Sequence, residues 1–492
     1  MVRNKRTIAF LLFFLVLMIF CSGCSGEESL ASVNSTGPIS EEVSVELKSS
    51  TQKPLSESSE IQSEISPTEH LVKGTVEEAA MNTLVVLAED GHSYQFSKED
   101  AEITTGETGI LLGNPVEVSF YGELDPQSVA QTVKVISIVV SDAEDRSDSS
   151  ESEETRSESL EKARLILSEM TLEEKVGQMF LARCPDQGAA EKAAAYHLGG
   201  YILFARDFEG KTTEQVVQEI QSYQDVSQIP MLIGVDEEGG TVNRVSRYPQ
   251  FRESPFCSPQ EIYEAEGFDG ILRDTQEKAQ LLKSLGINLN FAPVCDVSEN
   301  PNDFIYDRSF GKGSQETAQY VEKVVSVMKE QKIGSVLKHF PGYGNNGDTH
   351  TGIVSDNRSL ETFTESDFLP FEAGIQAGSD VVLVSHNIVT CMDSQYPASL
   401  SPKVHQILRE ELGFSGVIVT DDLAMDAIRD FTDDSYAAVL AVQAGNDLLC
   451  CTDFEEQIPA VLEAVKQGAL KEETIDDSVL RILEMKLSLG LL

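Results

Sequence analysis

Residues able to act as nucleophiles, acids or charged binding groups stand at the ends of short apolar runs. Asp236 ends PMLIGVD, Lys338 and His339 end IGSVLKH, His386 ends DVVLVSH and Asp421 ends SGVIVTD. Taken singly, each of these residues would more often be a structural or capping residue. Their shared position at the ends of strand-like runs instead favours one site to which all of them contribute.

A second group with acid–base chemistry lies in the Gly/Asn-rich stretch GNNGDTH, where Asp348 and His350 are two residues apart. A histidine with an ordinary pKa of about 6.5 titrates close to neutral pH. A nearby carboxylate orients the ring and stabilises its imidazolium form. A solvent-exposed loop histidine is the alternative interpretation. The pair therefore predicts a general acid–base group on a loop.

The elements that must position these residues are eight apolar strand-like runs with helical segments between them. The runs are GQMFLAR (177–183), GGYILFAR (199–206), PMLIGVD (230–236), INLNFAPV (287–294), IGSVLKH (333–339), DVVLVSH (380–386), SGVIVTD (415–421) and NDLLCC (446–451). This alternation predicts an α/β fold, a closed (β/α)8 barrel of the TIM type, rather than an open doubly wound sheet. The ends of the strands then converge on one mouth of the barrel, where active sites are built.

The N-terminal region predicts an exported protein. MVRNKR is cationic, TIAFLLFFLVLMIF is an uncharged apolar run, and CSGC follows, which is typical of a secretory signal in residues 1–24. Ser22 and Gly23 before Cys24 resemble the processing site of a bacterial lipoprotein, which implies lipidation of Cys24, although Cys21 stands where leucine is usual. An uncleaved signal anchor is the alternative. Both interpretations predict an extracytoplasmic, membrane-attached protein, and the first anchors it to the cell membrane by lipid.

Composition divides the remaining chain into four parts. Residues 25–70 are rich in Ser, Glu and Thr and predict a disordered tether, because such a segment buries too little apolar surface to offset its ordering entropy. Short alternating apolar runs predict a small β domain in 71–140. SDAEDRSDSSESEETRSES indicates an acidic linker in 141–158, and the barrel is expected in 159–492. The six cysteines after Cys24 show no metal-ligand spacing and are expected to be buried free thiols.

Six motifs of the barrel region resemble the successive signatures of glycoside hydrolase family 3. They are VDEEGGTVNR (235–244), NFAPVCDV (290–297), DRSFG (307–311), KHFPGYGNNGDTH (338–350), PASLSPKV (397–404) and GVIVTDDLAM (416–425). The chain is most similar to the single-barrel β-N-acetylglucosaminidases of that family, some of which act in peptidoglycan turnover. The resemblance covers about 160–492, with its motifs in the order found in the family.

The resemblance implies a role for each candidate residue. Asp421, the first aspartate of the DD pair, would be the nucleophile that forms a covalent glycosyl-enzyme, and Asp348 with His350 would be the acid–base dyad. The residues implied to bind the N-acetylhexosamine are Asp236, Arg244, Arg308, Lys338 and His339. For Lys338, a structural ion pair with a carboxylate on a neighbouring strand is the alternative.

Other features of the same motifs carry separate expectations. Gly239 and Gly240 are expected to let the backbone approach a ligand closely. Tyr343 departs from the family pattern, which often has a second histidine there, and the stretch before Asp348 is one residue shorter than is common. Both departures lie in the loop that would hold the dyad, so loop reach is where this chain is expected to differ.

Charge and motif content limit the partners. The chain has 37 Lys and Arg against 82 Asp and Glu, a net charge of −45, which repels nucleic acid. No cofactor or metal is expected, and the partners predicted are a carbohydrate substrate and the membrane. Two alternatives stay open. A phosphorylase could use the same site, because a histidine acid–base group does not repel phosphate. A non-catalytic wall-sugar-binding lipoprotein is the other, although Asp421, Asp348 and His350 together weigh against it.

Overall fold

The computed structural model describes the chain from residue 69 onward, with gaps. The described residues are 69–79, 83–88, 92–98, 101–105, 110, 113–122, 124–125, 131, 133–140, 149–347, 349 and 352–492. The chain forms two compact units, Met1–Asp142 and Ala143–Leu492. The predicted signal with Cys24, and residues 25–68 of the predicted tether, lie outside the described residues, as do Asp348 and His350.

Eight parallel strands form the centre of the second unit. They are β7 (Phe180–Arg183), β8 (Gly200–Leu203), β9 (Leu232–Val235), β10 (Leu289–Asn290), β11 (Gly334–Phe340), β13 (Val381–Val384), β15 (Val417–Thr420) and β16 (Leu449–Cys451). Their order in the sheet is β15-β13-β11-β10-β9-β8-β7-β16. A parallel bridge between Val419 and Leu448 joins the two ends. The predicted (β/α)8 barrel is confirmed, with each strand at one of the eight apolar runs.

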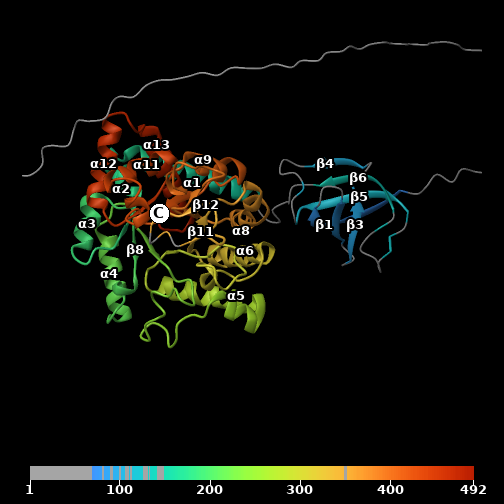
Figure 1. Ribbon diagram of the computed structural model, residues 1–492, viewed down its shortest axis with the longest axis horizontal. Helices are drawn as coiled ribbons and strands as arrows, with labels where there is room; N and C mark the ends of the chain where they lie inside the picture. The colour runs from blue at the N-terminus through green and yellow to red at the C-terminus, as the bar shows by residue number, and fades with distance from the viewer. Residues whose placement is uncertain are drawn as a thin grey trace, which may run out of the picture. The chain divides into compact units, whose positions relative to one another are not determined.

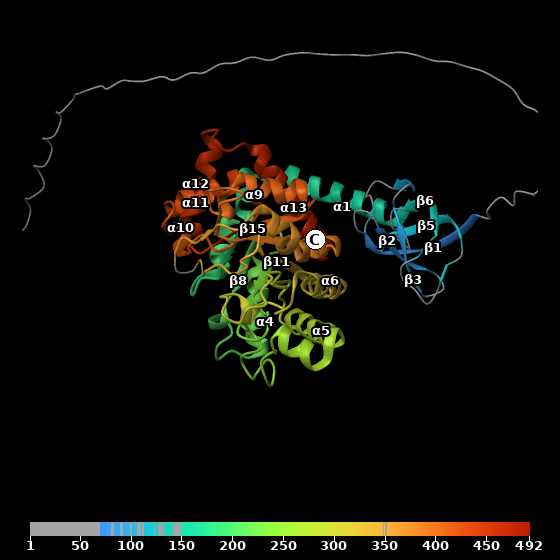
Figure 2. The same cartoon turned by 45° about the vertical axis from the view of Figure 1, so that its right-hand side comes forward.

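Helices lie outside the strands and follow the alternation expected of the barrel (Figures 1 and 2). They are α1 (Ser149–Glu169), α2 (Leu172–Gln178), α3 (Ala189–Tyr196), α4 (Thr213–Asp225), α5 (Pro259–Ser284), α6 (Ser314–Glu330), α7 (Leu360–Thr362), α8 (Phe368–Gln376), α9 (Pro402–Gln406), α10 (Asp426–Arg429), α11 (Asp434–Ala444), α12 (Phe454–Lys466) and α13 (Glu472–Ser488).

Sequence-local capping fixes where several of these helices begin. Thr212 precedes α4 and accepts a hydrogen bond from the backbone N–H of Gln215, whose side chain accepts the N–H of Thr212 in return. Ser258 and Glu261 make the same capping box at the start of α5. Such reciprocal bonds satisfy backbone donors that have no partner within the helix.

Most strands of the barrel are buried along their whole length. Every residue of β9, β11, β13 and β15 is buried, because the barrel interior covers one face and the helices cover the other. Continuous apolar runs, rather than alternating ones, are therefore the pattern that these strands leave in the sequence.

Helix α1 differs from the expectation for its segment. It begins at Ser149, inside the stretch 141–158 that composition predicts as a linker. Glutamate is a good helix former, so an acidic composition does not by itself distinguish a linker from the first turns of a helix. Further along α1, Ala163 is fully buried, and Ile166 and Leu167 pack against the barrel core.

The first unit contains one six-stranded sheet. Its strands are β1 (Glu69–Ala79), β2 (Thr83–Ala88), β3 (Ser93–Ser97), β4 (Glu102–Thr105), β5 (Pro115–Tyr121) and β6 (Lys134–Val140), in the order β3-β2-β1-β5-β6-β4. All neighbours are antiparallel except β4 and β6. Alternate residues of β5 point into a core that includes Val118 and Phe96, which is the period-two pattern of a sheet with one covered face.

The six cysteines after Cys24 all lie in the second unit. Cys184, Cys295, Cys450 and Cys451 are buried free thiols, but Cys257 and Cys391 are exposed, so the expectation of burial is wrong for these two loop residues. Among the described residues, no helix combines the length and the apolar character that a membrane crossing requires.

Lys486 is a fully buried lysine at the end of the barrel opposite the mouth. It lies on α13, and its Nζ donates hydrogen bonds to Oε1 of Gln178, at 2.6 Å, and to the carbonyl oxygen of Gly199, at 3.1 Å. It forms no ion pair with any residue that the structure describes. Burial lowers its pKa to about 7.

Replacing this amine should change how stability depends on pH. The unfolded state keeps the ordinary pKa of 10.5 and binds the proton more tightly than the fold does. Below about pH 7 the buried amine is charged and lowers the stability of the parent by its full amount. Between pH 7 and 10.5 the free energy of unfolding of the parent rises by up to about 1.4 kcal/mol per pH unit. We therefore expect the free energy of unfolding of Lys486→Met to fall relative to that of the parent as the pH rises from about 6 to about 9.

Urea unfolding followed by the circular dichroism of the helices measures this difference at the two pH values. Lys466→Met, which removes an exposed lysine of α12 paired with Glu173, is the matched control and should show a nearly constant difference. A pH-independent difference for Lys486→Met would mean that Lys486 is charged in the folded protein.

Candidate active site

The carboxyl ends of the barrel strands surround a cavity of about 460 Å³. Asp236 directly follows β9, Lys338 and His339 are the fifth and sixth residues of β11, and Asp421 directly follows β15. Arg244, from the loop after β9, and Arg308, from the loop after β10, complete the predicted set in the cavity wall. The structure thus brings together the six predicted residues that it describes.

A buried ion-pair network forms one side of this cavity. Lys338 Nζ lies 2.7 Å from Oδ1 of Asp236 and 2.6 Å from Oε1 of Glu238. Arg308 donates two hydrogen bonds to the Glu238 carboxylate, from Nε at 3.0 Å and from Nη2 at 2.8 Å. Arg244 approaches Asp236 at 3.8 Å. The ion pair considered as the alternative for Lys338 is therefore present, and the same lysine also lines the cavity.

Electrostatics keep this network charged. Burial raises the pKa of Glu238, but the charges of Arg308 and Lys338 outweigh that effect and hold the pKa well below its ordinary value. Burial likewise lowers the pKa of Arg308, and Glu238 more than offsets it, so the net shift is upward. Glu238 is therefore a carboxylate at neutral pH, and it compensates two cations that would otherwise be costly to bury.

Asp296 fixes the ring of His339. Its Oδ2 lies 2.7 Å from Nδ1 of His339 and also accepts the backbone N–H of His339, at 3.1 Å. Arg308 Nη2 lies 3.3 Å from the other ring nitrogen, Nε2. Because a guanidinium has only donors, Nε2 accepts and Nδ1 carries the proton, which faces the carboxylate. His339 is therefore held in one orientation and one tautomer.

Tyr343 takes a structural position in the loop after β11. Its backbone N–H donates to Oδ1 of Asp296 at 2.7 Å, and its buried hydroxyl lies 2.7 Å from Oγ1 of Thr349. Burial raises the pKa of the Tyr343 hydroxyl, which stays neutral. Thr349 is the residue between Asp348 and His350. The tyrosine that departs from the family pattern thus contacts the loop in which the predicted dyad lies, while the dyad itself is outside the described residues.

The two aspartates after β15 have different surroundings. Asp422 Oδ1 accepts the N–H of Ala424 at 2.9 Å, and its Oδ2 accepts the hydroxyl of Thr452 at 3.0 Å. Burial raises the pKa of Asp422. Asp421 accepts the N–H of Asp422 on Oδ1, at 2.8 Å, and lines the cavity. Asp422 thus holds the turn after β15, whereas α10 begins only at Asp426, with Met425 as its N-cap and no side-chain cap.

His386 is engaged on both ring nitrogens. Nδ1 lies 2.7 Å from the hydroxyl of Ser399, and Nε2 lies 3.0 Å from the carbonyl oxygen of Asp422. The ring is fully buried. His386 therefore links β13 to the loop after β15 and supports the position of the two aspartates.

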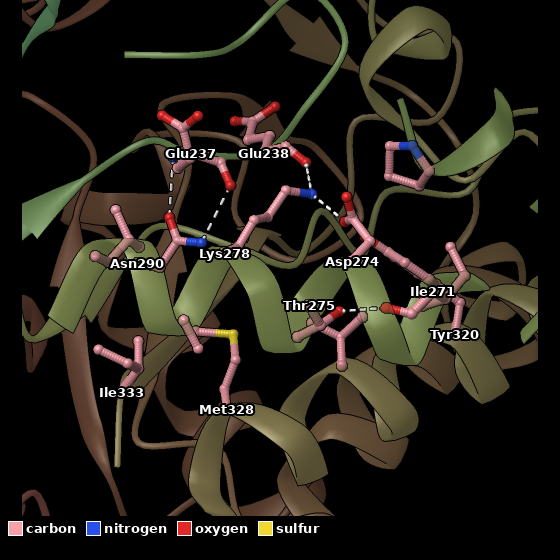
Figure 3. A pocket seen from close by; sticks show the side chains of 15 residues that line it. Glu237, Glu238, Ile271, Asp274, Thr275, Lys278, Asn290, Tyr320, Met328 and Ile333 are labelled. Carbon is pink, nitrogen blue, oxygen red and sulfur yellow. Dashed lines mark hydrogen bonds and ion pairs between the residues drawn. The ribbon is translucent and has the colours of Figure 1, made fainter. Parts of the chain in front are cut away.

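The loop after β9 is supported by Asn290 and by Lys278 of α5 (Figure 3). The Asn290 side chain accepts the N–H of Glu237 at 2.9 Å and donates to its carbonyl oxygen at 3.1 Å. Lys278 donates to the carbonyl oxygen of Glu238 at 3.0 Å. Beneath these contacts lies a cavity of about 20 Å³, which has room for about one water molecule and none for a sugar.

The same loop is also held by the Glu237 carboxylate. It accepts the backbone N–H groups of Arg244 and Val245, each at 2.8 Å, and that of Ser246 at 3.1 Å. Glu237 is fully buried and its hydrogen bonds fold the loop back on itself. The two consecutive glutamates thus have different roles. Glu237 fixes the shape of the loop, and Glu238 compensates the charges of Lys338 and Arg308.

Gly239 and Gly240 have a packing role. Both have positive φ angles, 103° and 58°. A Cβ at Gly239 would lie 2.2 Å from the carbonyl oxygen of Cys257, and one at Gly240 would lie 2.8 Å from the Cβ of Ser258. The clash that excludes larger residues comes from the segment that enters α5, and close approach of a ligand to these glycines stays a prediction.

Sequence analysis missed three functional carboxylates, Glu237, Glu238 and Asp296. All three stand inside the quoted motifs VDEEGGTVNR and NFAPVCDV, so their position was visible. Their partners lie far away in sequence, since Glu238 pairs with Arg308 and Asp296 with His339, and no local pattern reveals them. Among the described residues, no group of three or more His, Cys, Asp or Glu side chains is arranged to hold a metal ion.

Comparisons with known proteins show which family and which proteins the chain resembles. The model of the glycosyl hydrolase family 3 N terminal domain matches residues 171–485. The chain is 29% identical over 330 residues to Beta-hexosaminidase A of Pseudoalteromonas piscicida, which covers 61% of this chain and 55% of that protein. It is 31% identical over 326 residues to Beta-hexosaminidase LpqI of Mycobacterium tuberculosis, which covers 64% of this chain and 82% of that protein.

Solved structures show the same relationship. A glycoside hydrolase family 3 beta-N-acetylglucosaminidase from Paenibacillus sp. superposes with a TM-score of 0.61 at 31% identity, over 65% of this chain and 63% of that one. The structure of LpqI from M. tuberculosis gives a TM-score of 0.61 at 27% identity, over 66% of this chain and 96% of that one.

Glu238 should be essential for the stability of the barrel mouth. We expect Glu238→Gln, which keeps the shape and removes the charge, to destabilise the protein by roughly 3 kcal/mol or more, because two buried cations lose their shared carboxylate. Thermal unfolding measures the loss. Glu264→Gln, at an exposed position of α5, is the control. An equal change in the two variants would show that Asp236 alone compensates Lys338 and Arg308.

Proposed function

The chain belongs to glycosyl hydrolase family 3, and from that premise we propose that it is an exo-acting, retaining β-N-acetylglucosaminidase. The observation that carries the proposal is the meeting of Asp421 with Asp236, Arg308 and Lys338 in one cavity at the barrel mouth. The names of the similar proteins, which are beta-hexosaminidases, support an N-acetylhexosamine substrate.

The proposed binding mode assigns the charged groups of the cavity to the sugar. Asp236 follows β9 and presents a carboxylate that accepts hydrogen bonds from sugar hydroxyls. Arg244, Arg308 and Lys338 supply donors, and His339 supplies an acceptor, Nε2, since its Nδ1 proton faces Asp296. Because Asp236 and Lys338 are already hydrogen-bonded to one another, at 2.7 Å, their positions are set before the sugar arrives and little ordering is needed on binding.

The proposed reaction has two displacements. In the first, the Asp421 carboxylate bonds to the anomeric carbon while the bond from that carbon to the leaving oxygen breaks, and protonated His350 gives its proton to that oxygen. In the second, water bonds to the anomeric carbon and gives a proton to neutral His350, and Asp421 departs as a carboxylate. Asp348 orients the His350 ring and stabilises its charged form.

Hydrolysis is the proposed outcome rather than transfer to phosphate. The beta-hexosaminidase relatives support a hydrolase, whereas a similar structure named as a beta-glucoside phosphorylase is 22% identical and carries information on the fold alone. Peptidoglycan fragments are the proposed natural substrates, and lipidation of Cys24 is the proposed anchor. Both rest on the sequence. Release of 4-nitrophenol from 4-nitrophenyl N-acetyl-β-glucosaminide tests the activity, and absence of release would contradict it.

Asp421 should be the residue that is labelled during turnover. We expect Asp421→Asn to reduce kcat by at least about a thousandfold with little change in stability, because it removes the nucleophile and alters only one side chain at the cavity. A 2-fluoro or 5-fluoro glycosyl inactivator should be recovered by mass spectrometry on Asp421. Asp422→Asn is the control for stability, and label on Asp422 would reject the assignment.

His350 should matter most for substrates that have poor leaving groups. Activated aryl glycosides need little protonation to depart, so we expect His350→Ala to slow glycosides with poor leaving groups at least about tenfold more than nitrophenyl glycosides. Asp348→Asn should give the same pattern more mildly. Comparison of kcat/KM across a series of leaving groups measures the effect. Equal losses for good and poor leaving groups would indicate a role in binding or folding.

A further inference from the structure

Arg183 is a cation in the cavity wall that the proposed mechanism does not use. It is the last residue of β7, and its Cζ lies 4.6 Å from the ring centroid of Phe204, which directly follows β8. Its Nε is buried and has no hydrogen-bond partner. No residue that the structure describes gives this guanidinium a hydrogen bond or an ion pair. Arg183 as a whole is half-buried, so its charge is only partly withdrawn from water, and a ligand in the cavity is the natural partner for its unpaired donors.

The other cations of the cavity are compensated within the protein. Lys338 and Arg308 share Glu238, and Arg429 lies 3.0 Å from Asp453. Arg244 is near Asp236. Arg183 differs from all of them, since its charge faces the cavity without a carboxylate of its own.

Asp207 is the carboxylate whose pKa responds to the charge of Arg183, and it is occupied elsewhere. Its Oδ2 accepts the N–H of Phe204 at 2.7 Å, and its Oδ1 lies 3.7 Å from Nε of Arg206. Burial raises the pKa of Asp207 even though Arg183 and other cations act in the opposite direction. Asp207 therefore holds Phe204, the ring on which Arg183 rests, rather than binding Arg183 itself.

The strand order places Arg183 on one edge of the proposed sugar site. Asp421 follows β15 and Asp236 follows β9. In one direction around the barrel, the strands between β15 and β9 are β13, β11 and β10, and Lys338 belongs to β11. In the other direction they are β16, β7 and β8, and Arg183 belongs to β7. If the proposed function holds, the sugar ring spans from Asp421 to Asp236. One ring edge then faces Lys338 and the opposite edge faces Arg183.

We infer that Arg183, resting on Phe204, binds an anionic substituent on the hexosamine ring, either a phosphate ester or a carboxylate. A guanidinium offers two parallel N–H donors that match the two oxygens of such a group. A neutral hydroxyl would accept one hydrogen bond and leave the charge unpaired. Arg183 is thus proposed to select charged over neutral amino sugars.

Binding of free sugars to the full chain tests this selectivity without requiring turnover. Calorimetry compares N-acetylglucosamine with its 6-phosphate and with its 3-O-lactyl ether, which separates phosphate from carboxylate. We expect one of the two anionic sugars to bind at least about tenfold more tightly than the neutral sugar, and Arg183→Gln to reduce that preference by about 10- to 100-fold.

Arg429→Gln is the matched control, since it removes the same charge from the same cavity but from an arginine that is paired with Asp453. This variant should keep the preference. Absence of any preference in the parent would overturn the inference. An equal loss in the two variants would also overturn it, because the preference would then come from the overall positive charge of the cavity and not from binding by Arg183.

Two further measurements keep the outcome clear. Arg183→Lys keeps the charge without the two-donor geometry and should weaken the preference about three- to tenfold, so it decides the matter if Arg183→Gln does not fold. An unchanged preference in Arg183→Lys would contradict two-point binding. Hydrolysis of the neutral nitrophenyl glycoside is measured separately, so that its failure rejects the proposed function, whereas loss of the preference alone rejects the role of Arg183.

Discussion

Compensation of the buried cations at the barrel mouth is the constraint on which the site depends. Lys338 and Arg308 are fixed by the barrel and its loops, and neither can be removed from water without a carboxylate nearby. Glu238 meets that need for both, and Asp236 shares Lys338. The position of Glu238 in turn depends on its neighbour Glu237, whose carboxylate gathers three backbone N–H groups and folds the loop after β9. The hydrogen bonds that hold this loop therefore also hold Glu238 beside the two cations of the cavity.

The same constraint gives the cavity a fixed polar wall. His339 is held between Asp296 and Arg308, and Asp421 and Asp422 are held at the end of β15 with His386 behind them. Such groups need no rearrangement to meet a polar ligand, which is the advantage of preorganised charges in a catalytic site. Against this background an arginine without a carboxylate partner stands out, and Arg183 is most simply explained by a negative charge on the ligand.

Much of this architecture could be predicted from the sequence, for definite physical reasons. Parallel strands covered on both faces appear as continuous apolar runs, so all eight were visible, and the residues at their ends marked the mouth. The partners were not visible, because Glu238 and Arg308 are separated by 70 positions and meet only because β9 and β10 are neighbours in the sheet. The requirement for glycine at 239 and 240 comes from the segment at 257 and 258, which no local pattern reveals. Arg183 ends the run GQMFLAR but lies outside the six quoted motifs, and the absence of a partner among the described residues is what draws attention to it.

The central claim is that Asp421 reacts covalently at the anomeric carbon from a fixed place beside this charged wall. The anomeric configuration of the first product tests it most directly. Proton NMR during the first minutes of hydrolysis of a β-N-acetylglucosaminide distinguishes the two anomers before they interconvert. Two successive displacements predict that the β anomer of N-acetylglucosamine appears first and later equilibrates. Initial formation of the α anomer would show a single displacement by water, and would contradict a covalent role for Asp421.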